Sequence, residues 1–97
     1  GLEKLFFAKN KKTAFEVAHA RGVILLELLR ANMPVVELTP AEIKVAATGY
    51  GNSDKQMVAK MVSKILNIKK LEHDDNAADA LATAIAASSL TRLRSIL

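Results

Sequence analysis

The sequence contains no cysteine and no tryptophan, and it has few aromatic residues, prolines or glycines. Without cysteine, a disulfide framework, a thiolate metal site and thiol catalysis are excluded, which fits a reducing cytosol. Aromatics make up 4% and hydrophobic residues 51%, so the core must consist of leucine, isoleucine, valine, alanine and methionine. The longest apolar run, residues 22–29, is interrupted by Glu27 and is too short to cross a bilayer. No stretch has the order of a signal peptide.

A length of 97 residues suits one small domain, and the net charge of +4 is unevenly distributed. Most lysines and arginines precede residue 71, whereas Glu72, Asp74, Asp75 and Asp79 lie in one short stretch near the end. A basic body beside an acidic cluster suits a polyanion bound around a metal site. An ordinary solvated surface is the alternative, because the net charge is modest.

The acidic stretch DDNAADALA, residues 74–82, is the most informative part of the chain. On a helix, Asp75 and Asp79 are one turn apart, and so are Asn76 and Asp79, so either pair shares a face. Oxygen ligands that converge on a cleft are what a hard cation such as Mg²⁺ requires. The alternative is a purely structural role, in which Asp75 or Asn76 caps the helix. The surrounding alanines would let another backbone pack closely.

The rest of the pattern predicts mostly helices with one or two strands. Residues 2–7 begin as the end of a strand, and the β-branched segment 35–38 predicts a second strand. Capping boxes at Thr13, Thr39 and Ser53 mark helix starts. We therefore expect helices over residues 13–30, from 40 to about 47, 55–66 and 77–97.

The predicted helices differ in their apolar faces. The later part of helix 13–30 is apolar almost all round, so it must be covered on more than one side, as a core helix or at a subunit interface. On helix 55–66 an apolar stripe should face the core; it comprises Met57, Val58, Met61, Val62 and Ile65. On the last helix we expect Leu81, Ile85 and Leu93 to be buried.

A loop with two glycines, residues 48–52, lies between two of the predicted helices, with Lys44 and Lys55 on its flanks. Glycines let backbone N–H groups approach a phosphate, and the following helix presents its positive end. A glycine-containing loop between helices is also ordinary, so the motif is weak by itself.

Three stretches together resemble the RuvC family of bacterial Holliday junction resolvases. They are LEKLFFAKNKKTAFEVAHARGVIL, LTPAEIKVAATGYGNSDKQMVAKMV and DDNAADALATAIA, and they occur in the family's order over nearly all of residues 2–97. The resemblance implies an α/β, RNase H-like domain of which residues 1–97 are the C-terminal portion, without the opening strands. It implies a cytoplasmic, Mg²⁺-dependent endonuclease (with Mn²⁺ as a substitute) that nicks four-way junction DNA symmetrically in recombination and repair.

The resemblance also implies site residues and partners. Glu3 and Asp79 match catalytic metal ligands, and Asn76 or Asp75 fills a third position. Matched DNA contacts are Phe6, which would stack on an opened base, and Lys9, Lys44, Lys55, Gly49 and Gly51. The family acts as a homodimer, which the resemblance places at helix 13–30 of this chain. Its expected partners are branch-migration motor proteins, and no association with a membrane is expected.

Two departures from the family pattern keep other functions open. Position 76 is Asn where the family more often has Asp or His, and the strand that carries the first catalytic Asp is missing. We therefore expect the 97-residue chain to be inactive alone. The alternatives are a non-catalytic module that binds branched DNA and a helical oligomerisation domain without a nucleic-acid role.

Overall fold

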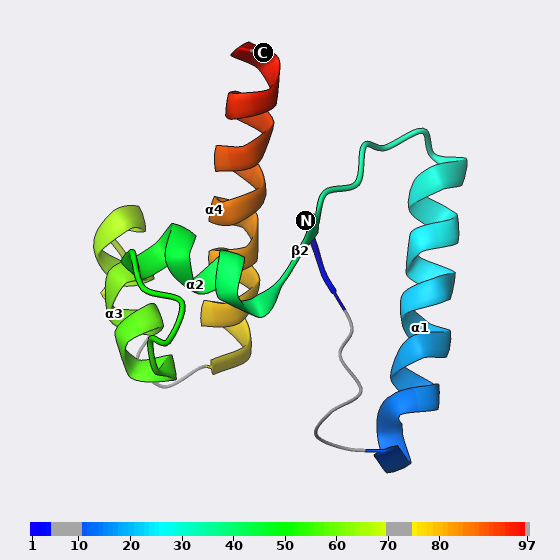
Figure 1. Ribbon diagram of the computed structural model, residues 1–97, viewed down its shortest axis with the longest axis horizontal. Coiled ribbons are helices and arrows are strands. Elements are labelled where there is room, and N and C mark those ends of the chain that lie inside the picture. Colours follow the sequence, from blue (N-terminus) through cyan, green and yellow to red (C-terminus); the bar gives the residue numbers. More distant parts are fainter. Residues whose placement is uncertain (5–10, 70–74, 97) are drawn as a thin grey trace. The chain divides into compact units, whose positions relative to one another are not determined.

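The computed structural model describes residues 1–4, 11–69 and 75–96, without the side chains of residues 11, 75 and 91–96. Its elements are β1 (Leu2–Glu3), α1 (Lys11–Arg30), β2 (Glu37–Leu38), α2 (Pro40–Thr48), α3 (Lys55–Leu66) and α4 (Asp75–Ile96) (Figure 1). They form two compact units, residues 1–3 with 36–97 and residues 4–35. No described helix is long and apolar enough to cross a membrane.

The two short strands form a parallel pair, with Leu2 opposite Glu37 and Glu3 opposite Leu38. A hydrogen bond of 2.8 Å from the Leu2 N–H to the Val36 carbonyl extends the pairing by one step. The predicted strand 35–38 is thus half right, because only its last two residues pair as strand. Leu38 is fully buried and anchors β2 to the helices behind it.

Helix α2 begins as the sequence predicts. The Thr39 hydroxyl accepts the Glu42 N–H at 3.1 Å, and the Glu42 carboxylate accepts the Thr39 N–H at 3.0 Å, which completes the capping box. At the other end, Gly49 adopts a φ of 87° and its N–H returns to the Val45 carbonyl. Because this left-handed conformation favours glycine, Gly49 already has a structural reason to be glycine.

The predicted bounds of α3 are confirmed, but its predicted cap is wrong. Asp54, and not Ser53, is the N-cap residue, and its carboxylate accepts the Met57 N–H at 2.8 Å. The Ser53 hydroxyl instead turns back into the preceding loop. Two adjacent candidates for a cap could not be separated by spacing alone.

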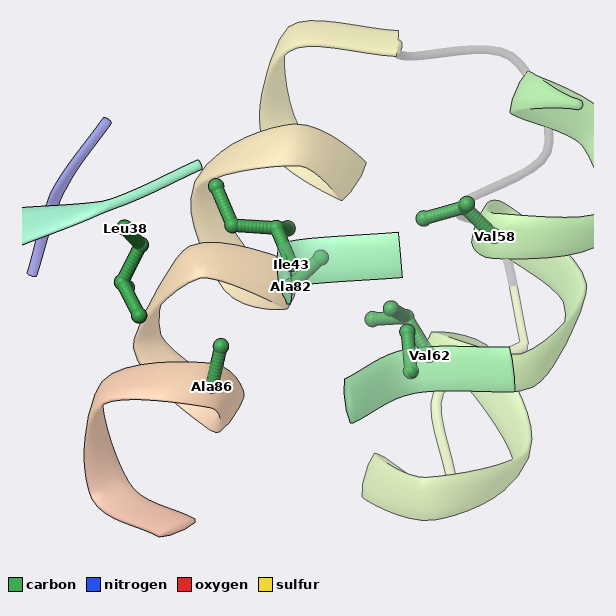
Figure 2. Close-up of a cluster of buried hydrophobic side chains, with 7 residues drawn as sticks. Leu38, Ile43, Val58, Val62, Ala82 and Ala86 are labelled. Atoms are coloured by element: carbon green, nitrogen blue, oxygen red, sulfur yellow. The ribbon is translucent and has the colours of Figure 1, made fainter. Parts of the chain in front are cut away.

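The core of the larger unit forms where α2, α3 and β2 pack on α4 (Figure 2). The most buried face of α4 is an alanine seam, which we define as Ala78, Ala82 and Ala86. Because alanine has a single methyl group, the neighbouring elements approach the helix backbone closely. Leu81 and Ile85 only flank this core, so the prediction that they form the buried face is corrected. The prediction for Leu93 lies outside the described side chains.

The apolar stripe predicted for α3 is buried only in its middle. Val58 and Val62 are buried with Ala59, whereas Met57 and Ile65 are 46% and 49% exposed. Figure 2 shows Val58 and Val62 directed toward the α4 side of the core.

The second unit contains α1, which begins two residues before the predicted start. Thr13 therefore lies inside the helix and cannot be its N-cap residue, which corrects the prediction; Lys11 and Lys12 are good helix formers and extend it. The helix ends at Arg30, after which Asn32 adopts a φ of 56°. Large apolar side chains on α1 remain exposed, among them Phe15, Val23, Ile24 and Leu29.

Candidate active site and nucleic-acid interface

A second face of α4 lies against the start of the chain, directly before β1. A Cβ atom built on Gly1 would lie 2.9 Å from the Cβ of Ala87 and 3.1 Å from the Thr83 side chain, so the start of the chain touches these two residues. Thr83 and Ala87 are one helical turn apart, and Asp79 is one turn before Thr83. We call Asn76, Asp79, Thr83 and Ala87 the acidic face of α4.

The direction of β1 bears on where Glu3 lies relative to this face. In Figure 1, β1 and α4 run in opposite directions. Two strand residues advance by about 7 Å and one helical turn by about 5.4 Å. On these spacings we expect Glu3 to reach about the level of Asp79.

The side chains of Glu3, Asn76 and Asp79 are all exposed. Asn76 is the second residue of α4, so it is not the N-cap residue, and the capping interpretation is wrong for it. Asp75 begins the helix, and its side chain lies outside the described residues. Among the described side chains no group of three His, Cys, Asp or Glu residues has the spacing of a metal site.

The donor set on this side of α4 nevertheless suits a hard cation. Glu3 and Asp79 offer exposed carboxylate oxygens, and Asn76 offers an exposed amide oxygen one turn from Asp79. Alanines at positions 77, 78 and 80 leave space around Asp79. Oxygen ligands of this kind fit Mg²⁺ or Mn²⁺.

The loop from Thr48 to Ser53 is held by two side-chain hydroxyls. The Tyr50 N–H donates to the Thr48 hydroxyl at 3.1 Å, and the Ser53 hydroxyl donates to the Tyr50 carbonyl at 2.7 Å. The two hydroxyls also hydrogen-bond to each other, and Ser53 is only 5% exposed. The backbone of Tyr50 is therefore fixed on both sides.

The lysines expected at a phosphate flank this loop. Lys44 is half-buried one turn before Thr48, and Lys55 is exposed as the first residue of α3. The expectation that the α3 N-terminus offers free N–H groups is weakened, because Asp54 already accepts the Met57 N–H. Phe6 and Lys9 lie outside the described residues.

Comparison with known proteins decides which family these features represent. The family model described as crossover junction endodeoxyribonuclease RuvC matches residues 1–87. The chain belongs to the RuvC family. The RuvC protein of Thermosipho melanesiensis is 53% identical over 83 residues, which cover 86% of this chain and 53% of the relative. The RuvC protein of Clostridioides difficile is 45% identical over 97 residues, which cover 100% of this chain and 57% of the relative.

The fold agrees with a solved RuvC structure. The structure of Thermus thermophilus RuvC superposes with a TM-score of 0.81 at 34% identity, covering 94% of this chain and 55% of that one. The fold class is therefore α/β and RNase H-like, here mostly helices with one parallel pair of strands. The chain spans about half the length of the RuvC relatives it matches.

Sequence reasoning missed two features of this RuvC chain. The contact of Gly1 with Thr83 and Ala87 was not predicted, although the four-residue spacing of Asp79, Thr83 and Ala87 marks a common face. The pairing of Thr48 with Ser53 was also missed, because Ser53 was assigned to a helix cap. Hydroxyl residues on both sides of a glycine-rich turn were the available signal.

Proposed function

We propose that the protein represented by this chain resolves four-way DNA junctions by paired symmetric nicks, as an endonuclease of recombination and repair. Family membership supports the proposal, and so does the name of its relatives, crossover junction endodeoxyribonuclease. The observation that carries it is the contact of the β1 segment with the acidic face of α4. From that contact we infer that the strand-borne carboxylate of Glu3 and the helix-borne carboxylate of Asp79 lie at one edge of the fold.

In this proposal Glu3 and Asp79 hold divalent cations, Mg²⁺ or in its place Mn²⁺. The third position belongs to Asn76 or Asp75; Asn76 has the better spacing, but its neutral amide is the weaker ligand. Bound cations would supply charge stabilisation for in-line hydrolysis of a phosphodiester. The Thr83 hydroxyl donates to the Asp79 carbonyl at 2.8 Å, so its polar group is satisfied within α4.

DNA binding is assigned to the α2–α3 loop and to the segment after β1. Lys44 and Lys55 contact phosphates, because neither lysine forms an ion pair with a described residue and both flank an exposed turn. Gly49 and Gly51 allow a close backbone approach, although Gly49 also serves as the α2 cap. Phe6 and Lys9 complete the proposed contacts, with Phe6 stacking on a base opened at the junction.

We further propose a homodimer formed through helix 13–30. The support is the set of apolar side chains left exposed on two sides of α1: Phe15 at 74%, Val23 at 63% and Leu29 at 59% on one side, and Ile24 at 51% on the opposite side. Exposed apolar surface of this extent marks an interaction site. We also propose that the protein acts in the cytoplasm, where branch-migration motor proteins would supply the junction.

A non-catalytic module that binds branched DNA is the second candidate, and Asn76 favours it. Asn76 is exposed one turn from Asp79, at a position where a carboxylate would serve a cation better. A helical oligomerisation domain is the third candidate, favoured by the exposed apolar residues of α1. The loop between Lys44 and Lys55 argues against this last function.

One experiment separates the three candidates. The chain is compared with a chimera that joins the upstream part of Thermosipho melanesiensis RuvC ahead of Gly1, using junction, duplex and single-stranded DNA with and without Mg²⁺. A nuclease predicts Mg²⁺-dependent nicking of the junction by the chimera and none by the chain alone. Junction binding without nicking by the chimera would support the non-catalytic module. Association of the chain without DNA binding would support the oligomerisation domain and contradict the proposal.

A further inference from the structure

Tyr50 lies at the tip of the α2–α3 loop, and the proposed function gives its side chain no role. It is 71% exposed, more than any other large hydrophobic side chain described in the unit of residues 1–3 and 36–97. Exposed aromatic rings are uncommon where packing alone decides, because burying them stabilises the fold. The loop thus presents a ring that the fold does not use.

The backbone beneath this ring is fixed before anything binds. The Thr48 hydroxyl accepts the Tyr50 N–H, and the Ser53 hydroxyl donates to the Tyr50 carbonyl, so both backbone polar groups of Tyr50 are held. The Thr48 hydroxyl also lies 2.9 Å from the Lys44 carbonyl, which ties the loop to the last turn of α2. A ring on a fixed backbone loses little conformational entropy when it makes a contact.

The charge around the loop indicates what it would contact. Lys44 lies one turn before Thr48, and Lys55 follows the loop directly. The carboxylate of Asp54 is engaged with the Met57 N–H, at the positive end of α3, which reduces its repulsion of a phosphate. A polyanion strand bound by both lysines would pass across Tyr50.

From these observations we propose that Tyr50 contacts DNA, with its ring packed on a deoxyribose of the strand whose phosphates Lys44 and Lys55 bind. The proposal rests on the proposed function, since it needs the loop to bind DNA. Ser53 is a positioning residue that acts through Tyr50. A contact with the sugar is independent of base sequence and carries no charge, so it strengthens binding without adding to its salt dependence.

The test is a fluorescence titration of labelled duplex and four-way junction with the chain over a series of salt concentrations. Tyr50→Ala should weaken binding to both DNAs by about five- to tenfold, at the lower end of aromatic contacts with nucleotides, with an unchanged salt slope. Tyr50→Phe should bind like the parent. Ile65→Ala, which removes an exposed apolar side chain at the far end of α3, is the control and should have no effect.

Ser53→Ala tests the positioning role by a double-mutant cycle. Ser53→Ala should weaken DNA binding in the parent protein. It should have no further effect in Tyr50→Ala, because both substitutions remove the same contact. An unaltered melting curve of the four proteins by circular dichroism excludes loss of fold.

Three outcomes would overturn the inference. Tyr50→Ala could bind like the parent while Lys55→Ala flattens the salt slope, so that the loop binds DNA without its ring. The loss of affinity in Tyr50→Ala could be confined to the four-way junction and absent for duplex DNA, which would indicate stacking on an opened base. A parent chain that binds no DNA at all would overturn the proposed function together with this inference.

Discussion

The acidic face of α4 and the loop between α2 and α3 are held in place by different means. The acidic face depends on packing across elements, because the alanine seam fixes α4 against the core and Gly1 fixes β1 on Thr83 and Ala87. The loop depends on its own hydrogen bonds between Thr48, Tyr50 and Ser53. Changes in the core should therefore displace the carboxylates, whereas changes in the loop should alter only binding.

The largest effect should come from Asp79→Asn in the chimera. Replacement of a carboxylate that holds a cation should lower junction cleavage by more than about a hundredfold, the upper end of losses seen for residues that merely support metal ligands. Junction binding in the absence of Mg²⁺ should be unaffected.

Asp54→Asn is the matched control for that change, because it removes the same charge while Asn remains a good N-cap residue. It should cleave at the parental rate. An equal loss of cleavage in Asp79→Asn and Asp54→Asn would contradict the distinction between the acidic face of α4 and the α2–α3 loop.

Overpacking of the alanine seam should have the next largest effect. Ala82 is fully buried, and Ala82→Leu should lower the free energy of unfolding by about 1–3 kcal/mol. Ala84 is exposed on the same helix, so Ala84→Leu should change stability by less than about 0.5 kcal/mol. Urea unfolding of both variants measures the difference, and equal stabilities would show that the seam does not fix α4.

Lys55→Ala should have a smaller effect, confined to binding. Loss of one phosphate contact should reduce the slope of log K against log salt by about one unit for any DNA. Lys64→Ala removes an exposed lysine near the far end of α3 and should change the slope less. An unchanged slope for Lys55→Ala would remove this lysine from the interface.

The smallest effect is expected for Asn76→Asp in the chimera. A carboxylate is a better ligand for a hard cation than an amide, so a modest gain in cleavage rate at low Mg²⁺ should follow if residue 76 holds the cation. No gain would assign the third position to Asp75. A rate series in Mg²⁺ for the chimera and this variant decides between them.

The sequence predicted elements well where local chemistry settled them. The capping box of Thr39 and Glu42 was found because both partners lie within one turn, and the bounds of α3 were right although its predicted cap residue was not. The box at Thr13 was wrong because a spacing can occur inside a helix as well as at its start. Motif order was enough to recognise the family, and the family model over residues 1–87 confirmed it.

Packing was harder to predict, because hydropathy does not state which face has a neighbour. Leu81 and Ile85 are more apolar than the alanines, yet Ala78, Ala82 and Ala86 form the buried face of α4. The reverse holds on α1, where Phe15 and Leu29 remain exposed. The contact between β1 and α4 joins the two ends of the chain, and no local pattern encodes it.

The central claim is that one edge of this fold carries the chemistry and the α2–α3 loop carries the binding. Its most direct test measures junction affinity and Mg²⁺-dependent nicking on the same samples of the chimera, Asp79→Asn and Lys55→Ala. We expect Asp79→Asn to bind like the parent without nicking, and Lys55→Ala to bind more weakly but nick at the parental rate when DNA is saturated. Robust nicking by Asp79→Asn, or a loss of nicking by Lys55→Ala at saturation, would contradict the account.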